Sequence, residues 1–325
     1  MKINRIFAAL LLIVIIFSLT ACGKEKDRGT LNVVIIKQLD HASLDEIAAA
    51  IEERLHELAN EQKMDIDILT VSGQNDPTIL KQLADQATAD NADVIIPIAT
   101  LAAQITASAV EKYGTPVVFA AISDPEGAGL TGLKNVTGTS DALNTATIID
   151  MMLSVDPDLK KVGLLYSLSE TNSELPIKDA KEILGQKGIE VVEATANTPD
   201  EVITGASFLA QSGVDAVFTP TDNVIMSAEL AIYETLRDAG IPHYAGADSF
   251  VRNGAFATCG VNYTDLGHRT AELAFDSVAG KELNDFYLMD GGIVTVNTET
   301  AAALGIDYSP LKSFGEVVEV VTTED

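Results

Sequence analysis

The sequence is poor in cysteine, aromatic residues and basic residues. Its 325 residues include two Cys and no Trp, and Phe, Trp and Tyr together make up 5%. Lys and Arg number 21 against 48 Asp and Glu, which gives a net charge of -27. Such a charge repels nucleic acid and anionic lipid, and no basic patch with interleaved aromatics is visible. We therefore exclude nucleic acid as a partner.

The chain is long and rich in apolar residues. Hydrophobic residues make up 47% of the sequence, a proportion typical of a globular protein rather than a disordered one. Without an N-terminal export signal, about 300 residues remain, which is enough for two lobes with separate cores.

The N-terminus has the three parts of a secretory signal. Lys2 and Arg5 form a basic head, an apolar run covers residues 6–19, and the sequence turns polar after Cys22. About 14 apolar residues are too few for a stable membrane span, which needs ~20. Leu19-Thr20-Ala21-Cys22 resembles the bacterial lipobox, in which the cysteine takes a diacylglycerol and becomes the new N-terminus. We expect a signal peptide at 1–21, a lipid on Cys22, a linker at 22–30 and anchoring to the extracytoplasmic face of the cell membrane. The alternatives are an ordinary cleaved signal or a short N-terminal anchor.

The second cysteine has no partner. With Cys22 lipidated, Cys259 cannot form an intrachain disulfide in the mature protein. It lies in the apolar, strand-like segment 255–260, which favours a buried and unreactive thiol.

Short apolar runs alternate with longer amphipathic segments along the chain. Apolar runs that alternate with helices in this way indicate parallel sheets covered on both faces. Two such series predict two similar α/β lobes, joined near 135–141, with a strand-like, irregular remainder at 286–321. The predicted strands are 31–36, 66–71, 94–98, 116–121, 162–166, 189–194, 216–219 and 242–245. The predicted helices are 44–60, 77–90, 101–112, 145–153, 173–187, 199–211, 224–239 and 266–279.

Polar residues follow most of these strands. Ligands of open parallel sheets bind beyond the carboxyl ends of the strands, so these loops are candidate site segments. Hydroxyls and N–H groups at helix N-termini suit a carboxylate, and buried Asp side chains suit an ammonium. Together they suit a zwitterion such as an amino acid. The competing interpretation is that each such residue only caps a helix.

Signatures of catalysis and of metal binding are missing. The sequence has no G-x-S-x-G elbow and no P-loop. The four histidines, at positions 41, 56, 243 and 268, lack zinc-site spacing. His41 is either a solvated loop residue or a ligand contact. We expect no enzyme activity, no catalytic residues, no metal and no cofactor.

A series of short segments occurs in a characteristic order and spacing: 97–100 with Ala103-Gln104, 121–125, 135–141, Tyr166 with 170–173, 220–223, 246–249 and 260–263 with Leu266-Gly267. Through these segments the chain, from Leu31 to about Gly305, resembles the substrate-binding proteins of ABC importers. This family has the type I periplasmic-binding-protein superfold, and the similarity is to its branch of tryptophan- and tyrosine-binding lipoproteins. Ser167 departs from the pattern, because Asn is expected there.

The resemblance implies two doubly wound, flavodoxin-like lobes with parallel sheets, a ligand cleft between them and three crossings, near Ser140, Asn262 and Phe286. Lobe one would comprise 31–139 and 263–285, and lobe two 140–262 and 286–325. The ammonium would be held by Asp222 or Asp248, with Asp248 favoured. The residues implied to line the cleft are Thr100, Ser123 and Asp124 in the first lobe and Glu170, Asn172, Ser173, Asp222, Asn223 and Asp248 in the second.

The implied function is that of an extracellular receptor that closes on a small ligand and docks on an ABC permease with its ATPase. An amino acid, aromatic or branched, is the expected ligand, and the receptor is expected to be a monomer. The alternatives are a binding module that feeds a sensor, a receptor for a nucleoside or another small metabolite, and an extracellular enzyme on the same lobes. The missing nucleophile and base signatures argue against the enzyme.

Overall fold

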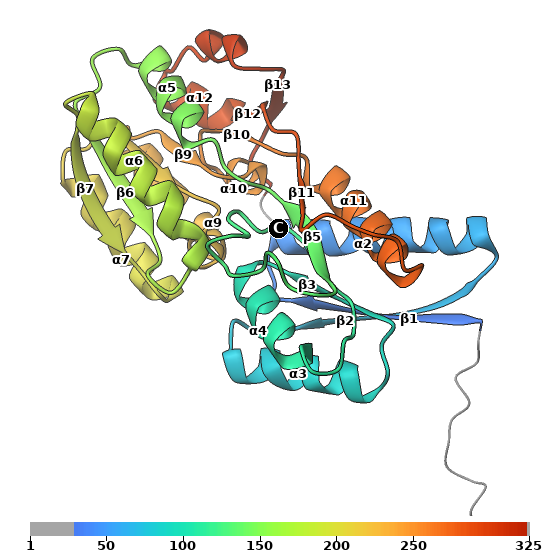
Figure 1. Cartoon of the computed structure of the whole chain (residues 1–325). Coiled ribbons are helices and arrows are strands. Elements are labelled where there is room, and N and C mark those ends of the chain that lie inside the picture. Colours follow the sequence, from blue (N-terminus) through green and yellow to red (C-terminus); the bar gives the residue numbers. More distant parts are fainter. Residues whose placement is uncertain (1–28, 324–325) are drawn as a thin grey trace, which may run out of the picture.

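The structure is a computed structural model that describes residues 29–323. The expected signal peptide and Cys22 lie outside the described residues. Figure 1 shows two lobes, each built on its own sheet, with the chain crossing between them several times. None of the helices within residues 29–323 is both long enough and apolar enough to span a bilayer.

The first lobe has a six-stranded sheet in the order β11-β5-β4-β3-β1-β2, in which every pair is parallel. Helices α2 and α11 cover one face of this sheet, and α3 and α4 cover the other (Figure 1). Its strands are β1 (Thr30–Lys37), β2 (Asp65–Ser72), β3 (Val94–Ile98), β4 (Val117–Phe119), β5 (Val136–Ser140) and β11 (Tyr287–Leu288). Its helices are α2 (Ala42–Gln62), α3 (Pro77–Ala89), α4 (Thr100–Val110) and α11 (Tyr263–Val278).

The second lobe has a seven-stranded sheet in the order β13-β12-β10-β9-β8-β6-β7. The sheet is mainly parallel, and β10 with β12 is its antiparallel pair. Its strands are β6 (Lys161–Tyr166), β7 (Glu190–Thr195), β8 (Ala216–Thr219), β9 (His243–Ala245), β10 (Ala257–Gly260), β12 (Ile293–Asn297) and β13 (Val317–Val320). Its helices are α5 (Thr145–Val155), α6 (Glu174–Gln186), α7 (Pro199–Gln211), α8 (Asn223–Met226), α9 (Glu229–Asp238), α10 (Asp248–Arg252) and α12 (Thr298–Leu304), with 3-10 turns η1 (Thr171–Ser173) and η2 (Ser309–Ser313).

Most of the predicted elements are confirmed, but the predicted helix 224–239 is wrong. It is two helices, α8 and α9, because the chain leaves the helical path at Ser227 and Ala228. The Ser227 hydroxyl donates to the carbonyl of Val224 at 2.7 Å, and a serine that bonds to a nearby carbonyl competes with the regular helix. The remainder 286–321 was expected to be strand-like and irregular. It contains the strands β11, β12 and β13 as expected, and also a helix, α12, which is capped by Asn297 and ended by Gly305 in the left-handed region.

The chain passes between the two sheets three times. It leaves the first sheet after β5 and returns between β10 and α11. The last crossing lies between β11 and β12, because Tyr287 and Leu288 still pair with β5. The sequence placed this boundary after residue 285, a few residues too early for the sheet pairing.

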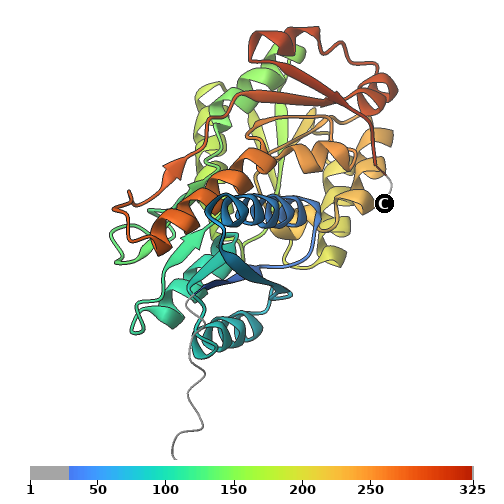
Figure 2. The same cartoon turned by 90° about the vertical axis from the view of Figure 1, so that its right-hand side faces the viewer.

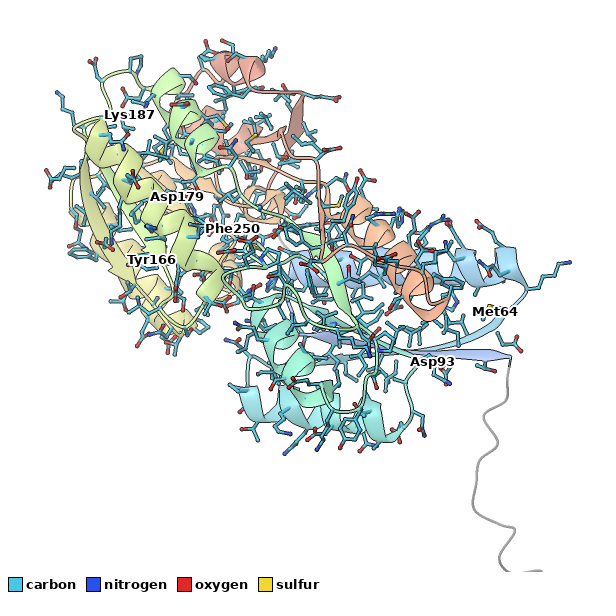
Figure 3. All side chains as sticks on the ribbon, in the orientation of Figure 1. Met64, Asp93, Tyr166, Asp179, Lys187 and Phe250 are labelled. Atoms are coloured by element: carbon cyan, nitrogen blue, oxygen red, sulfur yellow. The ribbon has the colours of Figure 1, made fainter. Side chains whose placement is uncertain are left out.

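The returning helix α11 lies directly beside α2 (Figure 2). Gly267 permits this approach, because a Cβ atom there would stand 2.6 Å from the Cβ of Ala50 and 2.8 Å from the carbonyl oxygen of Ile47. One apolar cluster continues from α2 and α11 of the first lobe to α8, α9 and Phe250 of the second, and Figure 3 shows Phe250 in the region where the lobes meet. The lobes therefore share packed apolar surface around the site.

Candidate functional site

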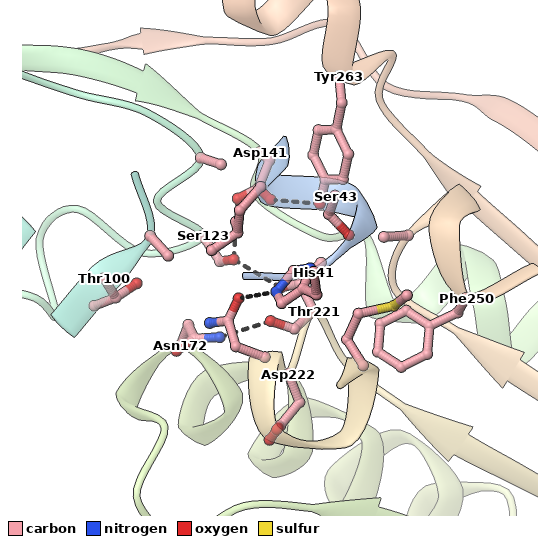
Figure 4. A pocket seen from close by; sticks show the side chains of 16 residues that line it. His41, Ser43, Thr100, Ser123, Asp141, Asn172, Thr221, Asp222, Phe250 and Tyr263 are labelled. Carbon is pink, nitrogen blue, oxygen red and sulfur yellow. Dashed lines mark hydrogen bonds between the residues drawn. The ribbon is translucent and has the colours of Figure 1, made fainter. Parts of the chain in front are cut away.

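A pocket lies where the loops of the two lobes meet, at the carboxyl ends of β1, β3, β4 and β8 (Figure 4). This is the position expected for a ligand site of open parallel sheets. Its free space is about 20 Å³, roughly the room of one water molecule. The pocket is lined by His41, Ser43, Leu44, Ala99, Thr100, Ala121, Ser123, Asp141, Asn172, Thr221, Asp222, Asn223, Met226, Ala247, Phe250 and Tyr263.

Two long helices of the first lobe begin at this pocket without a side-chain cap. The N-cap residue of α2 is His41 and that of α4 is Ala99, and neither side chain accepts a hydrogen bond from the first turn. By contrast, α3 begins at Asp76, whose side chain accepts from the N–H groups of Thr78 and Ile79. The first turn of an uncapped helix carries N–H donors and the positive end of the helix dipole. The first-lobe wall therefore favours an anionic group.

The backbone that shapes this wall includes two alanines in unusual conformations. Ala99 has φ 76° and ψ 163°, and Ala121 has φ 57°. Both line the pocket just beyond β3 and β4. A non-glycine residue at positive φ carries strain of about 1–3 kcal/mol, and such strain gathers at functional sites.

Asp141 is the acidic group of the first wall, and the sequence did not single it out. Its Oδ1 accepts a hydrogen bond from the Ser123 hydroxyl at 3.0 Å, and its Oδ2 accepts one from the Tyr263 hydroxyl at 3.1 Å. Burial raises the pKa of this carboxyl. Among residues 29–323 it forms no ion pair with Lys, Arg or His. Asp141 is therefore a carboxyl group at the pocket that no cation neutralises.

Asp222 is also buried, but its oxygens are occupied. Oδ1 accepts from the N–H of Ile225 at 3.0 Å, as the cap of α8. Oδ2 accepts from the N–H of Ser167 and from the hydroxyl of Ser173, each at 2.7 Å. Figure 4 shows its carboxylate directed away from His41 and Ser123. Burial raises the pKa of the Asp222 carboxyl. Its partners Ser167, Ser173 and Ile225 all belong to the second lobe, so Asp222 stabilises the loops of that wall.

Several hydrogen bonds run directly from one lobe to the other. Gln38 donates through Nε2 to Oε1 of Glu170 at 2.8 Å, and the Ser123 and Thr221 hydroxyls lie 2.9 Å apart. The residue His41 places Nε2 at 3.1 Å from Oδ1 of Asn223. A further bond joins the hydroxyls of Ser43 and Ser249. These contacts hold the lobes together around the pocket.

Two buried polar atoms of the lining residues have no hydrogen-bond partner in the described structure, Nδ1 of His41 and Oδ1 of Asn172. Buried polar atoms without partners are rare and call for an explanation. Burial lowers the pKa of the His41 imidazole, so the ring is neutral near pH 7. A neutral ring has one donor and one acceptor nitrogen, which leaves Nδ1 free for a ligand.

The structure brings five of the nine expected ligand residues to the pocket: Thr100, Ser123, Asn172, Asp222 and Asn223. Glu170 and Ser173 are buried behind this lining. The remaining two lie outside it. Asp124 accepts from the N–H of Gly127 at 2.9 Å in a neighbouring groove, and Asp248 pairs with Arg252 at 3.0 Å.

Sequence reasoning also missed several lining residues. Asp141 was treated as part of the join between lobes, and His41 as an ambiguous loop residue. Phe250 lies within α10, which follows β9. Tyr263 is the first residue of α11, where the chain returns from β10 to the first lobe. The position of Asp141 just after a strand was the one available signal. Within the described residues no group of three or more His, Cys, Asp and Glu side chains is placed to hold a metal ion.

Two lobes of mainly parallel sheets with a pocket between them are the architecture of the type I periplasmic-binding-protein fold. The chain belongs to the family described as ABC transporter substrate binding protein, whose model matches residues 32–313. It is therefore a substrate-binding receptor of an ABC transporter and not an enzyme. Receptors of this family act outside the cytoplasm and deliver their ligand to a permease.

The chain is similar to a tyrosine-binding protein of Clostridioides difficile strain R20291. The two are 30% identical over 288 residues, which cover 86% of this chain and 83% of that protein. A crystal structure of an ABC domain from Streptococcus pneumonia in complex with L-Trp is 29% identical, with a TM-score of 0.81 over 89% of this chain and 100% of that one.

A third relative is known in an open, ligand-free structure. This substrate-binding protein with adhesive properties from Clostridium difficile is 28% identical, and its structure covers 89% of this chain and 99% of its own, with a TM-score of 0.66. At nearly equal identity, the present structure thus superposes better on the tryptophan complex. Together with the interlobe hydrogen bonds and the small pocket, this indicates a closed arrangement of the lobes.

Proposed function

We propose that the receptor binds a free α-amino acid with an aromatic side chain and closes its two lobes around it. The observation that carries the proposal is the buried Asp141 carboxyl, which lies at the pocket among hydroxyl groups and without a cation. An amino acid supplies the missing positive charge. The tyrosine-binding relative and the tryptophan complex support an aromatic ligand.

We assign the ligand ammonium to Asp141 rather than to Asp222 or Asp248. The three hydrogen bonds that Asp222 accepts come from protein donors, and its carboxylate points away from the pocket. Asp248 has Arg252 as its counterion and does not line the pocket. A bound ammonium would favour the ionised form of Asp141, which opposes the effect of burial on its pKa.

The ligand carboxylate fits the ends of α2 and α4. Neither N-cap residue makes a side-chain cap. In α4 the N–H of Leu101 already donates to Oε1 of Gln38, and the remaining first-turn N–H groups can bind an anion. The hydroxyls of Ser43 and Thr100 line the same wall. His41 offers Nδ1 as one more polar contact.

The ligand side chain fits the apolar part of the lining, formed by Leu44, Met226, Phe250 and Tyr263. An amino acid is much larger than the present free space of about 20 Å³. The lobes must therefore separate for entry and adjust to the ligand on closing, and contacts made only in the closed state stabilise that state. Because both walls come from one chain, we propose that the receptor acts as a monomer and then docks on its permease.

Calorimetric titration with L-tryptophan, L-tyrosine and L-leucine tests this proposal. We expect the two aromatic amino acids to bind more tightly than leucine. Tryptamine lacks the carboxylate and indole-3-propionate lacks the ammonium, so each should bind at least tenfold more weakly than tryptophan. If no amino acid binds, and a nucleoside or another metabolite does, the proposed ligand class is wrong.

The assignment of the ammonium is tested by Asp141→Asn. We expect its affinity for tryptophan to fall about 10- to 100-fold, the size of a lost hydrogen bond to a charged group. Asp248→Asn is the matched control and should bind tryptophan nearly as the parent protein does. If Asp248→Asn loses affinity for tryptophan and Asp141→Asn does not, Asp248 is the residue that binds the ammonium.

We also propose that a lipid on Cys22 anchors the receptor to the extracytoplasmic face of the cell membrane. The lipobox-like sequence supports this, and a tether raises the effective concentration of the receptor near its permease. Cys22→Ala should move the protein from washed membranes to the soluble extracellular fraction. A Cys22→Ala protein that stays with membranes after a high-salt wash would contradict the lipid anchor.

A further inference from the structure

Glu170 joins the two lobes without lining the pocket. It lies between β6 and η1 in the second lobe and is 3% exposed. Its Oε1 accepts from Nε2 of Gln38 in the first lobe at 2.8 Å, and its Oε2 accepts from Nδ2 of Asn223 at 2.7 Å. It is not one of the lining residues. Its contacts thus serve the closed arrangement of the lobes rather than the ligand itself.

The partner of Glu170 in the first lobe is held firmly. Gln38 is fully buried. Its Nε2 also donates to Oδ1 of Asn75 at 2.9 Å, and its Oε1 accepts from the N–H of Leu101 at 3.0 Å. Leu101 belongs to the first turn of α4, which begins at the pocket. The Gln38 amide is therefore a fixed docking point next to the anion-binding wall.

Burial and the charge of Asp222 disfavour the ionised form of Glu170, whereas the amides of Gln38, Asn172 and Asn223 favour it. Asn223 donates to Glu170 through Nδ2 and contacts His41 through Oδ1. The His41 imidazole is neutral near pH 7 because burial lowers its pKa.

Among the described residues, no cation pairs with Glu170. Lys37, next to Gln38 in the chain, pairs with Asp40 and Asp45 instead. A buried carboxylate that lacks a counterion and lies beside a second carboxyl group is costly.

Burial, and then the charge of Asp222, raise the pKa of Glu170 to about 8, although the hydrogen bonds from Asn223, Gln38 and Asn172 act in the opposite direction. The protonated form of Glu170 is therefore favoured near pH 7 in this closed arrangement.

We propose that Glu170 is a positioning residue that holds the cleft closed in its protonated form, so that closure of the receptor takes up a proton. The inference rests on the closure described under the proposed function, but not on the identity of the ligand. When the lobes separate, Glu170 loses Gln38 and gains water, and its carboxyl returns toward its ordinary pKa of 4.5. The closed state therefore binds one proton more than the open state at intermediate pH.

The sign of the pH dependence follows from this difference. Since the pKa of Glu170 is higher in the closed state, closure is favoured at low pH and this advantage is lost as the pH rises toward about 8. His41 opposes the effect, because its pKa is lowered from 6.5 by burial and closure releases its proton in acid. The affinity should therefore rise by up to tenfold per pH unit from about pH 8 down to about pH 6.5 and level off below. Asp222 keeps its hydrogen bonds in both states, because Ser167, Ser173 and Ile225 move with it in the second lobe.

Titration of the full receptor with L-tryptophan at several pH values tests the proposal. The parent protein should show the slope and take up close to one proton per ligand near pH 7, measured in buffers with different ionisation enthalpies. Glu170→Gln keeps the hydrogen bond to Gln38 through its own amide oxygen and should bind tightly with no slope between pH 6.5 and 8. Glu170→Ala should bind at least tenfold more weakly at low pH. Asp248→Asn should keep the slope of the parent protein.

A second measurement covers the case in which tryptophan does not bind. Small-angle X-ray scattering of the ligand-free receptor should show a smaller radius of gyration at pH 6.5 than at pH 8.5. Glu170→Gln should have the same radius at both pH values. A Glu170→Gln protein that keeps the full pH slope, in binding or in scattering, overturns the proposal, whereas loss of tryptophan binding alone overturns only the ligand assignment.

Discussion

The two walls of the pocket use the same kinds of side chain in opposite ways. In the first lobe, the carboxyl of Asp141 contacts only neutral hydroxyls, and α2 and α4 begin without caps. In the second lobe, Asp222 caps α8 and also binds Ser167 and Ser173. The first wall thus leaves polar groups available, while the second wall satisfies most of its own.

This difference suggests a division of work between the lobes. The available groups of the first wall are suited to recognise a zwitterion. The second wall contributes residues that reach across, Glu170 to Gln38 and Asn223 to His41, and these are suited to closure. A buried acid at a ligand pocket is therefore informative only when its existing partners are counted.

The largest effect should come from Asp222→Ala. The substitution leaves the N–H groups of Ser167 and Ile225 and the hydroxyl of Ser173 without their acceptor. We expect the free energy of unfolding to fall by about 2–4 kcal/mol, as for a lost cap together with buried donors left unpaired. Chemical denaturation measures this. Asp141→Asn, measured in parallel, should keep the stability of the parent protein and lose affinity for the ligand. If instead Asp141→Asn loses stability and Asp222→Ala loses only affinity, the roles assigned to the two walls are reversed.

A pair of glycine substitutions separates packing near the pocket from packing elsewhere. A Cβ on Gly246 would stand 2.5 Å from the nitrogen of Thr221, a pocket residue, whereas a Cβ on Gly267 would meet α2 away from the pocket. Each alanine variant should lose about 1–3 kcal/mol of stability through overpacking. Only Gly246→Ala should also weaken ligand binding, since it displaces Thr221 from Ser123. Equal affinities in the two variants would show that the Thr221 contact is unimportant for closure.

The smallest effect is expected from Ala99→Gly. Glycine adopts the observed φ of 76° without strain, so removal of about 1–3 kcal/mol of strain should outweigh the entropic cost of glycine, about 0.5–1 kcal/mol. We expect the free energy of unfolding to rise by about 1 kcal/mol, as measured by thermal unfolding. The control is Ala49→Gly on the exposed side of α2, which should lose about 1 kcal/mol. If both variants are destabilised alike, Ala99 is not strained.

Much of the fold followed from local patterns. The strand predicted at 94–98 and the helix predicted to start at residue 77 both appear in the structure as predicted. The two-residue break between α8 and α9 was missed because it depends on one serine bonding to its own helix. The site was less predictable: five of the nine expected residues line the pocket, because a loop position near a strand end does not say where its side chain points.

The sequence by itself determined the two α/β lobes, because apolar runs of strand length separated by amphipathic helices can be buried only in covered parallel sheets. The tertiary structure decided which acid faces the pocket. Asp141, Asp222 and Asp248 all follow strands or strand-end loops, and their chemistry is the same. They differ in their partners. Asp141 accepts from side-chain hydroxyls, Asp222 accepts from the N–H group of the helix that it caps, and Asp248 pairs with Arg252. Arg252 and the Ile225 N–H are near neighbours in the chain, but Tyr263 lies 122 residues from Asp141, and Ser167 and Ser173 lie 55 and 49 residues from Asp222. Only the folded structure could assign those distant partners.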